Sequence, residues 1–244
     1  MRILVANHTA SISGAEVVLL RLLESLRSEH VIAVACPNEG PLAQALDQAL
    51  IRRTPVPACE ASFRPHPVRT PTGIMRICAG GAVLARSARR MHADVLYANT
   101  TRAALMGVVA RRLGAPPLVV RLHDQLPTTP FGQAVRSVIA GTAAAVIAAS
   151  EYTARAFNEG LSRPIATRVY NGIDHSRFDP DQVPSANLHD ELGIATDAVL
   201  LGQVAQITPW KAQDDAIRTL AELRRRDVNA HLVLVGAVAF TGKQ

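Results

Sequence analysis

The feature that most constrains the fold is a regular alternation of short apolar runs with longer segments whose apolar residues recur at helical spacing. The short runs are apolar throughout, as is typical of strands buried on both faces of a parallel sheet. Such alternation predicts a doubly wound α/β domain with right-handed crossovers, and we expect it to be Rossmann-like and to span residues 1–165. The expected strands are residues 3–6, 30–35, 94–97, 118–122 and 145–149.

The pattern changes at residues 166–190, which include Pro180 and Pro184 and are predicted to be an interdomain linker. A strand, a helix and a strand are then expected at residues 199–204, 213–226 and 231–235. One such unit cannot bury both faces of a sheet, so residues 191–244 are predicted to be the incomplete start of a second Rossmann-like domain. Residues 54–72 contain five prolines and cannot form one regular element.

Charge is unevenly distributed along the chain. Residues 1–178 hold 20 arginines and 11 acidic residues, a formal charge of +9, whereas residues 179–244 carry −3. This asymmetry favours contact of the first domain with lipid headgroups or a phosphorylated substrate, although arginines on a solvated face would look the same. A nucleic-acid partner is disfavoured, because aromatic residues make up only 4% of the chain and do not interleave with the basic ones.

The three cysteines are scattered and show no metal-ligand spacing, so we expect neither a metal site nor a disulfide framework. The chain begins directly with a strand-like run, which argues against a signal peptide, and its apolar stretches are too short to span a bilayer. These patterns predict a cytoplasmic protein, with peripheral membrane contact possible through the basic first domain.

Three segments resemble one protein family. They are SGAEVVLLRLLESL at residues 13–26, VYNGIDHSRFDP at 169–180, and VAQITPWKAQDDAIRTLAEL at 204–223 followed by HLVLVGA at 231–237. All three are similar to retaining glycosyltransferases of the GT-B fold, in the large family-four group. The resemblance implies transfer of a sugar from a nucleoside diphosphate sugar, with retained anomeric configuration and no metal or other cofactor. A glycan or lipid-linked acceptor is implied, in a setting such as cell-envelope polysaccharide biosynthesis.

Donor-side residues follow from the third segment. Lys211 matches the family lysine that stabilises the leaving diphosphate, because a positioned cation favours developing negative charge; a solvated surface lysine is the alternative. Gln206 stands where the family commonly has arginine, and Ala212 where it frequently has glycine. The resemblance also implies that Gly236 approaches the donor.

In the first segment, the resemblance implies that Gly14, Ala15 and Glu16 face the donor phosphates and the acceptor, since a helix start offers free N–H groups to phosphate. Simple capping of the helix by Ser13 is the alternative. The dinucleotide-binding pattern GxGxxG is missing after the first strand, which disfavours a dehydrogenase.

His123 ends a predicted strand and matches a family histidine near the reacting sugar. Asp124 could orient it or cap a turn, and Asn99 with Thr100 follows the preceding strand at the same edge of the sheet. The junction residues Asn171, Gly172 and Asp174 are expected to form a structural turn.

Two other functions remain open. The family's acidic motif, two glutamates eight residues apart, is expected after residue 244, so the chain could be a truncated, non-catalytic binding fragment. A GT-B sugar-nucleotide epimerase is a further alternative.

Overall fold

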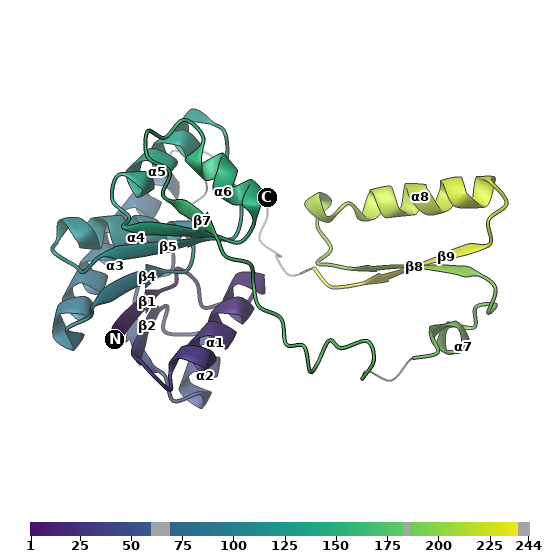
Figure 1. Ribbon diagram of the computed structural model, residues 1–244, viewed down its shortest axis with the longest axis horizontal. Helices are drawn as coiled ribbons and strands as arrows, with labels where there is room; N and C mark the ends of the chain where they lie inside the picture. Colours follow the sequence, from purple (N-terminus) through teal and green to yellow (C-terminus); the bar gives the residue numbers. More distant parts are fainter. Residues whose placement is uncertain (60–68, 183–185, 239–244) are drawn as a thin grey trace. The chain divides into compact units, whose positions relative to one another are not determined.

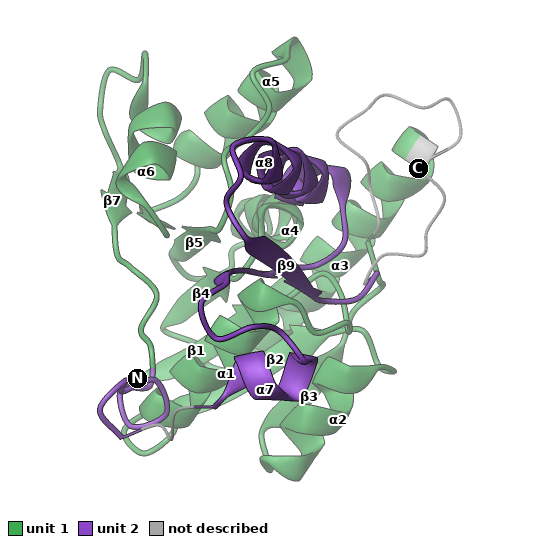
Figure 2. Ribbon diagram, turned by 90° about the vertical axis from the view of Figure 1, so that its right-hand side faces the viewer, with its two compact units in different colours: residues 1–173 green, residues 174–244 purple. Residues whose placement is uncertain are grey.

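A computed structural model describes residues 1–59, 69–182 and 186–238. The chain divides into two compact units, Met1–Ile173 and Asp174–Gln244, coloured separately in Figure 2. Each unit is described by itself.

Unit 1 is built on a sheet of seven parallel strands in the order β3-β2-β1-β4-β5-β6-β7 (Figure 1). β1 pairs with β2 on one side and with β4 on the other, so the chain crosses over β1 between β3 and β4. Ala6 lies opposite Ala35 of β2 and opposite Ala98 of β4. The predicted doubly wound α/β fold is confirmed. The strands are β1 (Arg2–Ala6), β2 (Val31–Cys36), β3 (Arg52–Pro55), β4 (Val95–Ala98), β5 (Leu118–Leu122), β6 (Ala145–Ala148) and β7 (Ala166–Arg168).

Helices lie on both faces of this sheet and bury it. On one face, Leu4, Leu96 and Val120 pack in a core with α3 to α6; on the other, Val5, Val34 and Tyr97 pack with α1 and α2. Alternate residues of a strand thus enter different cores, which explains why the strands are apolar throughout. The helices are α1 (Gly14–Leu26), α2 (Pro41–Gln48), α3 (Arg69–Met91), α4 (Thr101–Arg112), α5 (Pro130–Ala140) and α6 (Glu151–Asn158).

The structure adds two edge strands that the sequence did not predict. β3 has the sequence RRTP and β7 the sequence ATR, and neither is apolar enough to be recognised. β7 lies in the range that we predicted as linker, and its three residues pair with β6. The proline-rich range 54–72 contains the end of β3 and the start of α3, and residues 60–68 lie outside the described residues.

Unit 2 contains α7 (Leu188–Leu192), β8 (Val199–Val204), the 3-10 turn η1 (Pro209–Lys211), α8 (Gln213–Arg225) and β9 (Ala230–Val235). β8 and β9 are parallel, with Val199 opposite Ala230 and Val204 opposite Val235. No residue of α8 is buried. Among the described helices of both units, none combines the length and hydropathy that crossing a bilayer requires.

Candidate functional site

Polar residues gather where the central strands of unit 1 end. Asn7 and His8 follow β1, Asn99 and Thr100 follow β4, and His123 directly follows β5. Because parallel strands all end at one edge, these side chains share the edge at which open α/β sheets bind ligands. Hydrogen bonds connect them into two groups, one around Asn99 and one around Thr100.

The first group is a buried chain of side chains that links α1 to both central strands. Asn7 Nδ2 donates to Glu16 Oε1 at 3.2 Å and to the Thr9 carbonyl at 2.8 Å, and Asn99 Nδ2 donates to Asn7 Oδ1 at 3.1 Å. Asn7 and Asn99 are fully buried, and Glu16 is 2% exposed. Buried polar groups that are satisfied in this way hold one another in a single orientation.

His123 is attached to the end of this chain, with Nε2 at 3.4 Å from Asn99 Oδ1. Burial, and then the nearby Arg121 guanidinium, lower the pKa of His123, while the hydrogen bond with Asn99 and then the charges of Asp124 and Glu16 act in the opposite direction. The imidazole is therefore neutral at pH 7 and can exchange hydrogen bonds with an uncharged hydroxyl. Asp124 itself is exposed.

The second group joins His8, Thr100 and Arg102. His8 Nδ1 lies 2.8 Å from Thr100 Oγ1, and His8 Nε2 lies 3.4 Å from an Arg102 guanidinium nitrogen. Burial, and then the charge of Arg102, lower the pKa of His8 to about 4. His8 is therefore a second neutral imidazole at this edge. Thr100 also caps α4, since its Oγ1 accepts from the Ala103 N–H at 3.2 Å.

At the glycine-containing start of α1, Glu16 is buried and Gly14 is exposed. Glu16 Oε2 accepts hydrogen bonds from Ser13 N at 3.0 Å and Ser13 Oγ at 2.5 Å, so its buried carboxylate holds the start of α1, and the substrate contact that we expected of it stays a prediction. The Ala15 carbonyl faces inward as well, 3.4 Å from Asn99 Nδ2. Gly14 is exposed, and a Cβ added there would meet no atom within 4 Å. Backbone at Gly14 is thus the part of this segment that is open to a ligand.

The junction residues take part in turns and side-chain contacts. Within unit 1, Asn171 Oδ1 accepts from the guanidinium of Arg121, which is 6% exposed. Within unit 2, Asp174 Oδ1 accepts from Ser176 N at 3.0 Å and Ser176 Oγ at 2.6 Å. Gly172 has open space around it. Asn171 therefore anchors the end of unit 1 to β5.

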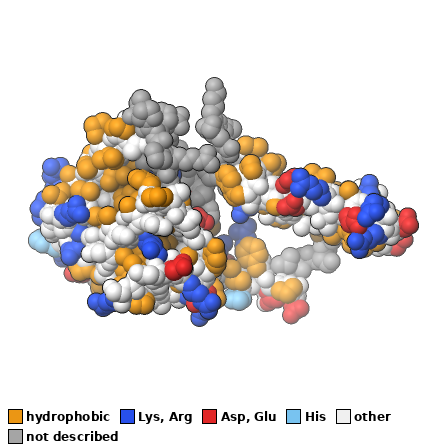
Figure 3. All heavy atoms as spheres, turned by 90° about the horizontal axis from the view of Figure 1, so that it is seen from above, with side chains coloured by type: hydrophobic (Ala, Val, Ile, Leu, Met, Phe, Trp, Pro, Cys, Tyr) orange, Lys and Arg blue, Asp and Glu red, His pale blue; other side chains and the backbone are white. Residues whose placement is uncertain are grey.

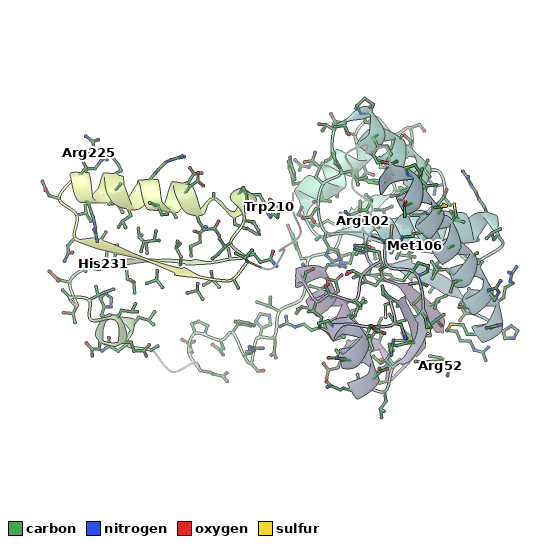
Figure 4. All side chains as sticks on the ribbon, turned by 180° about the vertical axis from the view of Figure 1, so that it is seen from behind. Arg52, Arg102, Met106, Trp210, Arg225 and His231 are labelled. Atoms are coloured by element: carbon green, nitrogen blue, oxygen red, sulfur yellow. The ribbon has the colours of Figure 1, made fainter. Side chains whose placement is uncertain are left out.

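Unit 2 places Gln206, Lys211 and Gly236 after the carboxyl ends of its two strands. The Lys211 side chain is exposed, and its backbone carbonyl accepts from Gln203 Nε2 at 2.6 Å. The Gln206 carbonyl accepts from Gln213 Nε2 at 2.8 Å. A Cβ on Gly236 would lie 1.8 Å from the Ala205 carbonyl oxygen, so glycine alone fits between the two strand ends. Trp210 lies beside Lys211 in the turn before α8 (Figure 4).

Sequence reasoning missed Asn7, His8, Arg102 and Arg121. Asn7 and His8 directly follow the first strand, and that position was the available signal. Nothing in the sequence distinguishes Arg102 from the other arginines, because its importance comes from a contact with His8 across 94 residues. Among the described residues, no group of three or more His, Cys, Asp or Glu side chains could hold a metal ion.

The fold of unit 1 and the polar residues at its edge define an open α/β domain that binds ligands at the carboxyl ends of its strands. The model of Glycosyltransferase Family 4 matches residues 12–177, more than half of the chain, and the chain belongs to that family.

Individual proteins resemble this chain in sequence and in fold. Over 137 residues, 54% of this chain, it is 31% identical to a GDP-mannose-dependent alpha-(1-6)-phosphatidylinositol monomannoside mannosyltransferase of Mycolicibacterium smegmatis. It is 25% identical to Anabaena Alr3699/HepE, with a TM-score of 0.72 both to that protein's complex with UDP-glucose and to its complex with UDP and glucose; the match covers 99% and 98% of this chain. The chain spans 36% of the mannosyltransferase and 62% of the Anabaena protein.

Proposed function

We propose that the protein transfers a sugar from a nucleoside diphosphate sugar to a glycan or lipid-linked acceptor, with retained anomeric configuration. The observation that carries this proposal is the neutral His123 at the end of β5, held by the buried chain that begins at the start of α1. The GDP-mannose dependence of the mycobacterial relative and the UDP-glucose bound to the Anabaena relative support a nucleotide-sugar donor.

In this proposal each residue acts on a definite part of the substrates. The bond from the anomeric carbon to the diphosphate oxygen breaks, a bond from that carbon to the acceptor oxygen forms, and the proton of the acceptor hydroxyl passes to an oxygen of the departing diphosphate. Lys211 stabilises the charge that develops on the diphosphate. The neutral imidazole of His123 forms a hydrogen bond with a sugar hydroxyl, and Gly14 lets a phosphate approach the α1 backbone. Gln206 and Gly236 contact the donor. No metal or cofactor takes part.

The domain assignment belongs to the same proposal. Unit 1 would hold the acceptor, and residues 191–244 would belong to the donor-binding part. Gln206, Lys211 and Gly236, which the proposal assigns to the donor, all lie in unit 2.

The decisive experiment is a calorimetric titration of the 244-residue chain with UDP and GDP. We expect saturable binding of one nucleotide that weakens about tenfold in Lys211→Ala, as is reasonable for one charge-assisted contact. Arg218→Ala is the matched control, because Arg218 is an exposed cation on the neighbouring helix α8. Equal affinities for Lys211→Ala and the unchanged chain would contradict the role of Lys211. A folded chain that binds neither nucleotide would favour the non-catalytic fragment.

A lipid-linked acceptor would place the protein at a membrane surface. The excess of arginine over acidic residues in residues 1–178 supports contact with anionic lipid. On the face that Figure 3 shows, the cationic side chains lie in small separate groups. Co-sedimentation with vesicles of neutral and of anionic lipid tests this part of the proposal, and equal binding to both would contradict it.

A further inference from the structure

The hydrogen bonds around Thr100 assign it a role that the family resemblance does not supply. We propose that the Thr100 hydroxyl determines specificity by donating a hydrogen bond to an oxygen of a substrate sugar. Arg102 and His8 are then positioning residues, which fix the direction of the Thr100 O–H. The nature of the ligand rests on the proposed function; the direction of the proton rests on the structure of unit 1 alone.

The first step concerns the tautomer of His8. A guanidinium donates hydrogen bonds and has no lone pair to accept one. Arg102, in the first turn of α4 (Figure 4), has a guanidinium nitrogen 3.4 Å from His8 Nε2, so that ring nitrogen must be the acceptor. Because the ring is neutral at pH 7, its single proton then resides on Nδ1.

The second step follows at Thr100. His8 Nδ1–H points at Thr100 Oγ1 over 2.8 Å and donates to it, while the Ala103 N–H donates to the same oxygen over 3.2 Å. A hydroxyl oxygen has two lone pairs, and both are used. The hydroxyl proton must therefore point away from His8 and from α4. Among the described residues, the structure shows no acceptor for it.

The third step is the position of this proton. Thr100 directly follows β4, is only half-buried, and is adjacent in sequence to the Asn99 that holds His123. An outward O–H at the ligand-binding edge of a parallel sheet suits an oxygen of the substrate. A sugar presents hydroxyl oxygens of this kind, and a site that supplies a fixed donor discriminates against an analogue lacking the matching oxygen.

One part of the test does not depend on any ligand. Nitrogen-labelled histidine spectra at pH 7 should show His8 protonated on Nδ1 and bare on Nε2. Arg102→Met should abolish this fixed preference, whereas Arg112→Met, at the far end of α4, should retain it. A His8 that carries its proton on Nε2 in the unchanged chain would overturn the proposal, whether or not the Arg102 variant folds.

The other part uses D-glucose and D-mannose as probes, followed through the amide signals of residues 99–103. Thr100→Ser retains both the α4 cap and the donor, and Thr100→Asp retains the cap but lacks the donor. We expect the affinity for the sugar to remain within about threefold in the serine variant and to fall about tenfold in the aspartate variant. Equal losses in both variants, or no response of these amides to either sugar, would overturn the assignment.

The nucleotide titration separates this inference from the proposed function. A chain that binds UDP or GDP but gives no sugar response at residues 99–103 would refute the role of Thr100 alone. A sugar response that depends on Thr100, in a chain that binds neither nucleotide, would leave Thr100 as a sugar contact and refute the nucleotide-sugar donor.

Discussion

The side-chain nitrogen of Asn99 lies 3.1 Å from the side-chain oxygen of Asn7, and this bond joins the ends of β4 and β1 across 92 residues of sequence. Both amides are fully buried, so loss of either partner would leave a polar group unsatisfied in the core. Asn99 also contacts His123. The packing of the central strands and the orientation of a candidate catalytic group therefore depend on the same pair of residues.

Acid should destabilise unit 1 through His8. Its pKa is about 4 in the folded chain and 6.5 when unperturbed, so the unfolded chain takes up a proton at a higher pH than the folded one. The free energy of unfolding is therefore independent of His8 titration above about pH 6.5. It falls as the pH decreases toward 4, by up to about 3 kcal/mol. Urea unfolding at pH 7, 5 and 4 should show a shallower pH dependence in His8→Gln. His175→Gln, an exposed position, should behave like the unchanged chain.

Removal of the Asn171 side chain should destabilise the end of unit 1. Arg121 is buried, and Asn171→Ala deprives its guanidinium of a partner, which should reduce the free energy of unfolding by about 2 kcal/mol. Asn171→Asp offers a carboxylate in the same place and should restore stability at pH 7, because the guanidinium favours the charged form of the carboxyl. Denaturant unfolding of both variants at pH 7 checks this, and an alanine variant as stable as the parent would contradict it.

A methyl group at Gly236 should not be tolerated. Its Cβ would lie 1.8 Å from the Ala205 carbonyl oxygen, so β8 and β9 would have to separate at their carboxyl ends. We expect Gly236→Ala to cost about 2 kcal/mol or more in unit 2. Gly202→Ala provides the control, because the same addition within β8 meets no atom within 4 Å. Amide hydrogen exchange in β8 and β9 should accelerate in the first variant only.

Replacement of Ala212 by glycine should stabilise the start of α8. It precedes α8 with φ +58° and ψ +38°, a left-handed conformation that costs a residue with a Cβ about 1 kcal/mol. Ala212→Gly should therefore slow hydrogen exchange in the first turn of α8. Ala216→Gly, inside the same helix, should accelerate it, since glycine weakens a helix interior by about 1 kcal/mol. Faster exchange in both variants would refute this account of Ala212.

The sequence predicted the central strands and helices because their cores are apolar at regular spacing. It missed β3 and β7, whose residues RRTP and ATR lie at the edges of the sheet and are largely exposed or half-buried. An edge strand is defined by backbone pairing with one neighbour, and this leaves little trace in side-chain composition.

Within the site, position at a strand end indicated Asn99, because all parallel strands end at one edge, and for His123 the same position agreed with the family resemblance. The partners of a residue were not predictable in the same way. Glu16 was expected to face a ligand, and its burial follows from the place of Asn7 beneath α1. His8 and Arg102 acquire their relation only when β1 lies beside β4, a pairing that the order of the elements along the chain does not reveal.

The adjacency of β1 and β4 has a consequence for the newly made chain. β1 can pair with β2 as soon as Cys36 has emerged from the ribosome, but its other neighbour ends at Ala98. At a synthesis rate of about 5–20 residues per second, one edge of β1 stays unpaired for about 3–12 seconds. Asn7 remains without Asn99 over this interval, and His8 without Thr100. The nascent chain therefore exposes one edge of the five-residue β1 during this interval, and an unpaired strand edge of this kind can pair with another chain.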